Sequence, residues 1–268
     1  MAPQALAAAA PGAAPSVQLA TTTLVALLLA SIRATAWLVA CPPFSSRLIP
    51  APVKALLGVA IALPLAPGLT GRLPALTTGG LLVAAVEQVV AGAALGFLAG
   101  MLFAAVEAAG NLLDVFGGFS AAFAFDPLSR TGNSVFGRFH NLLATTLLFV
   151  TDGHQLVLRG FSQSYRTLPL SGTLSLSALD SALTTGLGQL MLSAVEIAGP
   201  LIGVLFCADV GLGLLNRAAP ALSAFSLGFP LKILLTLTLA GLSLLVLPEV
   251  LRGIIEQAVR TVVAVAHG

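Results

Sequence analysis

The sequence predicts an all-α membrane protein built from long and broken helical hairpins. Hydrophobic residues make up 57% of the 268 residues, charged residues only 8%, and the mean hydropathy is +1.03. Soluble domains carry about 25% charged residues, so a soluble fold of this composition would expose apolar surface almost everywhere. Several apolar runs also reach the roughly 20 residues that a bilayer-crossing helix needs. Lipid or other apolar protein must therefore surround much of the chain.

The first part of the chain contains one full span and one shorter apolar run. Residues 19–40 form a span with a single charge, Arg33, and a Cys-Pro-Pro sequence ends it. The next run, residues 53–65, is short for a full crossing and ends at prolines, which favours a half-crossing element. Residues 1–16 are rich in Ala and Pro and lack Lys and Arg, so we expect a flexible N-terminus that is not a secretory signal peptide.

A long apolar run at residues 81–113 carries glycines at intervals of four, at Gly92, Gly96 and Gly100. This spacing places them on one stripe of a helix, where small residues let another helix approach closely. We predict a tight seam here, either with a helix of the same chain or with another subunit. Ordinary packing in a chain rich in Ala and Gly is the alternative.

Residues 115–125 form the most unusual segment, VFGGFSAAFAF, which has no charge and leads into an Asp-Pro turn. Some of its phenylalanines share one helical face, but adjacent glycines weaken a helix. A broken or re-entrant element is therefore predicted, and irregular backbone at membrane depth must be buried in protein or line a cavity. The residues concerned are Phe116, Gly117, Gly118, Phe119, Phe123 and Phe125.

Further apolar runs complete a single helical domain, which we expect to extend over residues 17–250. A Gly-Phe-Pro sequence at 228–230 predicts a break in the last long run, and the tail at 251–268 has the charge pattern of an amphipathic interfacial helix. An Asp-Gly-His break at 152–154 separates the first two of the remaining runs. These runs lie at residues 139–151, 155–168, 183–215 and 225–247.

Charged residues inside apolar spans are costly and are therefore candidates for function. They can form a proton or ion relay, or they can pair and fix how helices pack, and we favour pairing. The candidates for buried ion pairs are Glu107, Glu196, Asp209 and Lys232.

Several functional classes find no support in the sequence. The chain contains no nucleophile elbow, metalloprotease, dinucleotide-binding or phosphate-loop motif, so we expect neither an enzyme nor a cofactor. Its two cysteines lie far apart in apolar stretches, which predicts no metal site. A net charge of +2 without a basic stripe predicts no nucleic-acid binding.

Three stretches resemble the FliR family, the R subunits of the flagellar export gate, which are related to the SctT subunits of virulence-type type III secretion systems. The first is the apolar glycine-rich segment before Asp126-Pro127. The second is residues 139–169, with Asp152 where the family usually has Asn. The third and most specific is GLGLLNRAAPALSAFSLGFPLKI at residues 211–233, with Ala221 where the family usually has Gln. Asp114, just before the apolar segment, is a further departure.

The resemblance implies a subunit of the flagellar type III protein export gate in the bacterial inner (cytoplasmic) membrane, at the flagellar basal body. It implies a helical complex with FliP-like and FliQ-like gate subunits and an FlhB-like switch subunit, through which unfolded flagellar substrates pass. By position, residues 115–125 correspond to the family's pore-plugging loop. Residues expected to pack against helices or subunits are Asn216, Arg217, Pro220, Gly228, Phe229 and Pro230, besides the glycine ladder.

Two alternatives stay open at the level of sequence. One is an export-apparatus T subunit of a virulence-type type III secretion system. The other is a stand-alone secondary transporter, in which broken helices at 115–130 and 228–230 form a midplane site for a solute or coupling ion. The short chain and the absence of a clear inverted repeat count against a transporter.

Overall fold

The computed structural model describes residues 15–120, 134–172, 175–218 and 224–267, and every regular element in these ranges is a helix. The prediction of an all-α fold is thereby confirmed. The elements in chain order are α1 (Pro15–Ala40), α2 (Ala51–Ala62), α3 (Ala66–Leu69), the 3-10 turn η1 (Thr70–Arg72), α4 (Thr78–Phe116), α6 (Val135–Val150), α7 (Gly153–Thr167), α8 (Leu176–Ala218) and α9 (Ala224–His267).

Within the described ranges, three segments are long and apolar enough to cross a membrane, at Ala20–Ala40, Thr78–Phe116 and Leu179–Ala218. The pair formed by α2 and the short turn that follows it is a fourth candidate, because together the two parts are sufficiently apolar. They are bent by 67°, as in a broken span or a re-entrant loop. The short run expected at 53–65 therefore forms an interrupted element.

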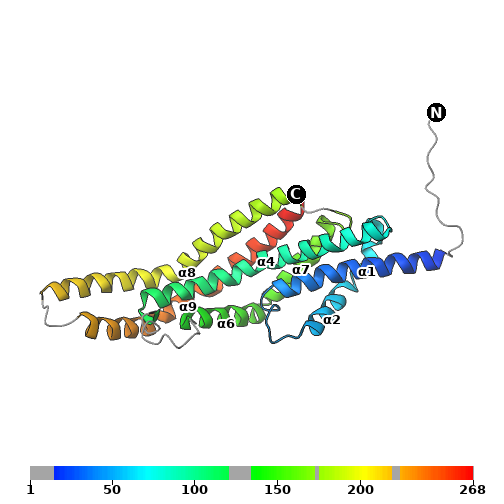
Figure 1. Ribbon diagram of the computed structural model, residues 1–268. Helices are drawn as coiled ribbons and strands as arrows, with labels where there is room; N and C mark the ends of the chain where they lie inside the picture. Colours follow the sequence, from blue (N-terminus) through cyan, green and yellow to red (C-terminus); the bar gives the residue numbers. More distant parts are fainter. Residues whose placement is uncertain (1–14, 121–133, 173–174, 219–223, 268) are drawn as a thin grey trace.

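The helices form an elongated bundle around α4, which is 39 residues long (Figure 1). α1 packs against α4 and α2, and α6 and α8 pack farther along α4. α8 and α9 run side by side as a hairpin of two very long helices (Figure 1). Both change direction along their length, and each contains an internal proline, Pro200 in α8 and Pro248 in α9. A proline inside a helix removes a backbone hydrogen bond and bends the helix.

Two apolar cores hold this bundle together. The first joins α1, the α2–α3 region, α4 and α7 around Trp37, which is 2% exposed and stacks on Phe161 at a centroid distance of 4.5 Å. The second joins α4, α6, α8 and α9 around fully buried side chains such as Leu113 and Leu201. In segments that cross a bilayer, such leucines stabilise the fold through van der Waals packing and not through removal from water. The two cores lie at opposite ends of α4, so this helix connects them.

The helix boundaries differ from the sequence-based expectation in one respect. The break predicted at 228–230 is wrong, because α9 begins at Ala224 and continues through Pro230 without interruption. Pro230 is the seventh residue of α9 and has no N–H to donate to the preceding turn, so the helix continues here with one backbone hydrogen bond fewer. α9 also continues past residue 251 to His267, so residues 251–267 of the expected tail are the last part of this helix, and its interfacial role stays a prediction.

Candidate functional site

The glycine ladder lies where α4 packs against α1. A Cβ atom at Gly96 would lie 2.7 Å from the Ala40 Cβ and 2.8 Å from the Trp37 carbonyl oxygen. One at Gly92 would overlap the Arg33 carbonyl oxygen, whereas one at Gly100 would lie 3.4 Å from the Pro42 Cδ, an ordinary contact. Two of the three glycines therefore allow close backbone approach, and the seam is between two helices of the same chain.

Arg33 is fully buried at this seam and joins α1 to the segments around it. Its Nε donates to the Gln88 side-chain oxygen at 2.7 Å, and its Nη1 donates to the carbonyl oxygens of Leu168 at 2.9 Å and Ser164 at 3.3 Å. The guanidinium carbon lies 4.5 Å from the centroid of the Tyr165 ring. A buried charge is tolerated only when it is well hydrogen-bonded, and here carbonyl oxygens and an aromatic face serve in place of a carboxylate.

Tyr165 and Gln88 extend this polar cluster. Burial raises the pKa of the Tyr165 phenol above its ordinary value, so the hydroxyl stays protonated, and it donates to the Ala30 carbonyl oxygen at 2.7 Å. Gln88 donates to the Leu170 carbonyl oxygen at 3.2 Å. These bonds cross-link α1, α4, α7 and the chain that follows α7. The cluster fixes the position of the first core relative to α4.

Asp114 ties the end of α4 to the start of α6. It is 2% exposed and accepts a hydrogen bond from the Phe136 backbone N–H at 3.1 Å and another from the Ser134 hydroxyl. Ser134 in turn accepts from the Gly137 N–H at 2.7 Å. A carboxylate at a helix N-terminus satisfies orphan N–H groups and complements the helix dipole. Asp114, a departure from the family pattern, is therefore a helix cap in this chain.

The predicted gate segment leaves α4 directly after this cap. Gly118 has a φ of +84°, a left-handed conformation that favours glycine. A Cβ at Gly117 would lie 2.7 Å from the Thr236 hydroxyl oxygen of α9, and one at Gly118 would lie 3.4 Å from the Phe229 ring. The glycine pair therefore forms a turn that packs closely against α9.

The phenylalanines of the segment are placed only in part. Phe116 is 36% exposed, and Phe119 packs edge-on against Phe136 with ring centroids 5.2 Å apart. Phe123 and Phe125 lie outside the described residues. The start of the segment thus has one aromatic ring on the surface and one against the second core, and its role as a plug stays a prediction.

The four candidate charges have different surroundings. Lys232 Nζ lies 2.6 Å from Asp209 Oδ1, which joins α9 to α8, although both side chains are partly exposed at 21% and 42%. Glu107 accepts a hydrogen bond from the Asn141 amide at 2.8 Å, between α4 and α6. Glu196 is exposed and has no partner among the residues that the structure describes. The structure therefore brings two of the four together and does not gather all four into one cluster.

The residues of the expected packing motif lie near the tip of the α8–α9 hairpin. Asn216 and Arg217 are exposed at the end of α8. Gly228 is buried against Leu212 of α8, Phe229 is half-buried and Pro230 is exposed. Pro220 lies outside the described residues. Gly228 and Phe229 thus serve contacts within the chain, and subunit packing by the exposed residues stays a prediction.

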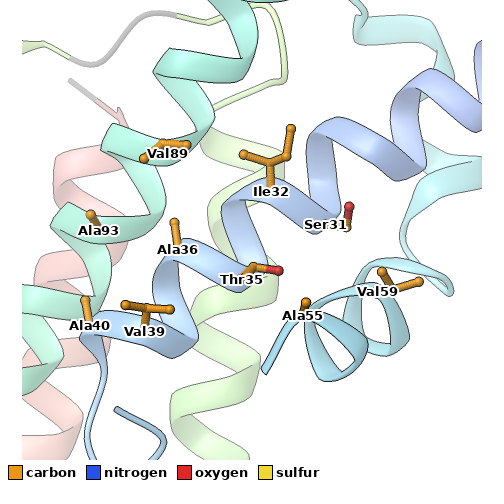
Figure 2. Close-up of a pocket in the computed structure, with 10 residues that line it drawn as sticks. All are labelled: Ser31, Ile32, Thr35, Ala36, Val39, Ala40, Ala55, Val59, Val89 and Ala93. Carbon is orange, nitrogen blue, oxygen red and sulfur yellow. The ribbon is translucent and has the colours of Figure 1, made fainter. Parts of the chain in front are cut away.

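A groove of about 500 Å³ opens between α1, α2 and α4 (Figure 2). Its polar side chains are the hydroxyls of Ser31 and Thr35, and Ser31 donates to the Leu28 carbonyl oxygen of its own helix. Such a lining has few polar groups with which to hold a polar solute. Among the described residues, no group of three or more His, Cys, Asp or Glu could hold a metal ion. The groove is lined by Ser31, Ile32, Thr35, Ala36, Val39, Ala40, Ala55, Val59, Val89 and Ala93.

Comparison with known proteins agrees with the resemblance in the sequence motifs. The profile of the family described as "Bacterial export proteins, family 1" matches residues 24–258. The chain belongs to this family. The match includes all three motif stretches, from the glycine-rich segment to the hairpin tip.

Individual members of the family give the same result. The chain is 35% identical over 221 residues to the flagellar biosynthetic protein FliR of Pectobacterium carotovorum, covering 81% of this chain and 83% of the relative. It is 34% identical over 218 residues to FliR of Escherichia coli K12, covering 81% and 84%. It is 33% identical over 155 residues to the secretion system apparatus protein SsaT of Salmonella typhimurium, covering 56% and 58%.

The structural roles of three residues are not predicted by the sequence. The sequence marks Arg33 as a costly charge inside a span, but the backbone carbonyl oxygens that bind it come from residues more than 130 positions away. Asp114 was noted only as a departure from the family. Gly110, whose Cβ would overlap the Phe136 carbonyl oxygen, was not noted, because it lies outside the four-residue ladder.

Proposed function

We propose that this chain is a subunit of the flagellar protein export apparatus, in the bacterial inner membrane, and forms part of the channel through which unfolded flagellar proteins pass. The observation that carries this proposal is the similarity to FliR proteins over more than 80% of both chains. Membrane insertion is supported by the three long apolar helices. The role that we propose is structural and not catalytic.

The virulence-type alternative is favoured less. The similarity to SsaT and to the SpaR proteins of Shigella extends over 56% of this chain, against 81% for FliR of Pectobacterium carotovorum and of Escherichia coli K12. The stand-alone transporter also has little support, because the four charges that would bind its solute do not form one cluster. The continuous α9 removes one of the two broken helices on which that alternative depended.

The partners we propose are FliP-like and FliQ-like gate subunits and an FlhB-like switch subunit. Apolar helix surface on the isolated chain supports such an assembly. Phe97, Phe206 and Leu245 are 55%, 62% and 77% exposed. Contiguous apolar surface is typical of an interface with protein or lipid.

We further propose that the segment beginning at Gly117 closes the channel. Its start is anchored, because Asp114 caps α6 and Gly117 and Gly118 press against α9, while the ring of Phe116 is partly exposed. A plug has to move while it stays attached to the channel wall. A segment that is anchored at its start and carries bulky apolar side chains after it suits this role. Hydrophobic constrictions block water and ions by dewetting and steric closure.

Deletion of the gene tests the function. A deletion strain is expected to lose motility and to release no rod, hook or filament proteins, and a plasmid copy restores both. A deletion strain that assembles full filaments would contradict the proposal.

Shortening the segment at 115–125 tests the plug separately. The shortened gate is expected to leak ions or small solutes, because the constriction is lost. Leu48→Ala, in the loop between α1 and α2 where Leu48 is 91% exposed, is the control and leaves the closed gate tight. Unchanged leakage from the shortened gate would contradict the plug assignment and leave the export role standing.

A further inference from the structure

One face of α8 carries an acidic side chain with no partner inside an apolar helix. Glu196 lies in the candidate membrane segment Leu179–Ala218, whose mean hydropathy is 2.0, and only a third of that segment is buried within the chain. It is exposed and accepts no hydrogen bond from any residue that the structure describes.

The surroundings of Glu196 on this face are apolar. Residues three, four and seven positions apart share one side of a helix, which places Leu192 on the same side as Glu196, and Val195 directly precedes Glu196 in the chain. Leu192 is 62% exposed and Val195 is 56% exposed. An aqueous surface would not gather large apolar side chains in this way, and a surface facing lipid would not carry a carboxylate, because a charge in hydrocarbon is costly. Neither water nor lipid suits both features.

Two glycines make a notch beside the carboxylate. Gly199 and Gly203 follow Glu196 by three and seven positions, and a Cβ at either would meet no atom within 4 Å. Glycines four apart on an apolar helix allow the backbone of a second helix to approach closely. The glycines of α4 already show this use within the chain, whereas the notch on α8 is not filled by any described residue.

We propose that this face of α8 is the docking site for an apolar helix of a different subunit of the export apparatus, and that this helix carries a lysine or arginine that pairs with Glu196. The inference rests on the proposed function, since it requires that the chain works within a complex. Charge complementarity decides the kind of occupant, because a partner cation neutralises Glu196 and the notch seats the backbone of the partner helix. Removal of one member of a desolvated charge pair leaves the other charge buried and unpaired.

Site-specific photo-crosslinking in native membranes tests this assignment. A photoreactive amino acid at Leu192, on the face, is expected to cross-link to another apparatus subunit, within about one helical turn of a Lys or Arg. The same amino acid at Leu187, which is 52% exposed but lies on another side of α8, serves as the position control and does not give this product.

Charge variants then test the role of Glu196. Glu196→Gln is expected to lower the yield of the Leu192 cross-link at least about tenfold, because the partner's cation loses its counter-charge. Asp180→Asn, which removes an exposed carboxylate from the same helix but from another side, is the matched control and leaves the yield unchanged. Glu196→Arg abolishes the cross-link, and changing the partner's basic residue to Glu restores it.

Other outcomes overturn the proposal. These are adducts of Leu192 with lipid, with exported substrate or with a second copy of this chain alone, or a yield that Glu196→Gln does not change. The isolated Glu196→Gln protein is expected to melt as the wild type does, since Glu196 has no partner within the chain, so misfolding does not imitate loss of docking. Failure of the proposed function looks different, because normal export from a deletion strain would refute it whatever the cross-links show.

Discussion

Replacement of Gly96 by valine tests how the chain is held together at the α1–α4 seam. The first atom of the new side chain would lie 2.7 Å from the Ala40 Cβ, 2.8 Å from the Trp37 carbonyl oxygen and 3.1 Å from the Cys41 backbone nitrogen. Two of these three atoms belong to the backbone and cannot rotate away, so α1 itself has to move. The replacement therefore forces apart the two helices that carry the first core.

The magnitude follows from the cost of overpacking. Extra atoms in a packed core cost about 1–3 kcal/mol, and the rigid backbone neighbours of Gly96 place this change at the upper end. A loss of about 2–3 kcal/mol in a chain of this size lowers the melting midpoint by roughly 5–10 °C. Gly100→Ala is the control, because its Cβ would make an ordinary contact and alanine favours a helix over glycine by about 1 kcal/mol.

Trp37 provides the assay. It is the single tryptophan of the chain and lies at the seam, 2% exposed and stacked on Phe161. Thermal unfolding of the purified protein in detergent is followed by Trp37 fluorescence and by helical circular dichroism. Gly96→Val is expected to melt earlier and to shift the emission of Trp37 toward that of an exposed indole, whereas Gly100→Ala melts at or above the wild-type midpoint. Equal midpoints for Gly96→Val and the wild type would refute the seam.

Three further substitutions probe the polar contacts. Arg33→Met removes the donor to the Leu168 carbonyl oxygen and to the Gln88 side-chain oxygen, and it is expected to lower the free energy of unfolding by about 3 kcal/mol in the same melting assay. Asp114→Ala removes the acceptor of the buried Phe136 N–H while the Ser134 N-cap stays, costs about 1–2 kcal/mol, and speeds hydrogen exchange of the Phe136 amide; unchanged exchange there would contradict this contact. Lys232→Glu costs about 0.2–1 kcal/mol, because the pair with Asp209 is partly exposed, and the double exchange with Asp209→Lys recovers most of this loss if the pair is real.

The sequence was sufficient for the fold class and for the positions of most helices. Apolar runs about 20 or more residues long correspond to α1, α4, α8 and α9, because hydropathy reports the environment of each residue directly. The break at 152–154 was also correct, since Asp152 has a φ of +56° and α7 starts at Gly153. The break expected at 228–230 was wrong, because α9 continues through Pro230 although this proline cannot donate a backbone hydrogen bond.

The contacts between distant segments could not be read from the sequence. The partners of Arg33 are mostly backbone carbonyl oxygens, which every residue carries, so no side-chain pattern marks them. Asp114 is recognised as a cap only once α6 is seen to start against the end of α4. The glycine ladder, in contrast, was visible as a period of four, and the structure decided only that its neighbour is α1.

For Glu196, the sequence predicted a contact that the described residues do not make. The sequence marked it as a charge in an apolar run, and we expected a partner within reach. The structure places it on an exposed face without one, while Asp209 and Lys232 pair with each other. The ion pair of Asp209 and Lys232 joins two helices of this chain. Glu196 is exposed instead, and we assign its partner to another subunit.

The most direct test of the central claim uses an export substrate that stalls in the channel because it is fused to a domain that cannot unfold. A photoreactive amino acid at Phe116, partly exposed at the end of α4, is expected to cross-link to the stalled substrate. The same amino acid at Leu82, which is 64% exposed near the other end of α4, is the control and gives no such product. A substrate that stalls without cross-linking to Phe116, or that cross-links equally from Leu82, would contradict a place for this chain in the wall of the export channel.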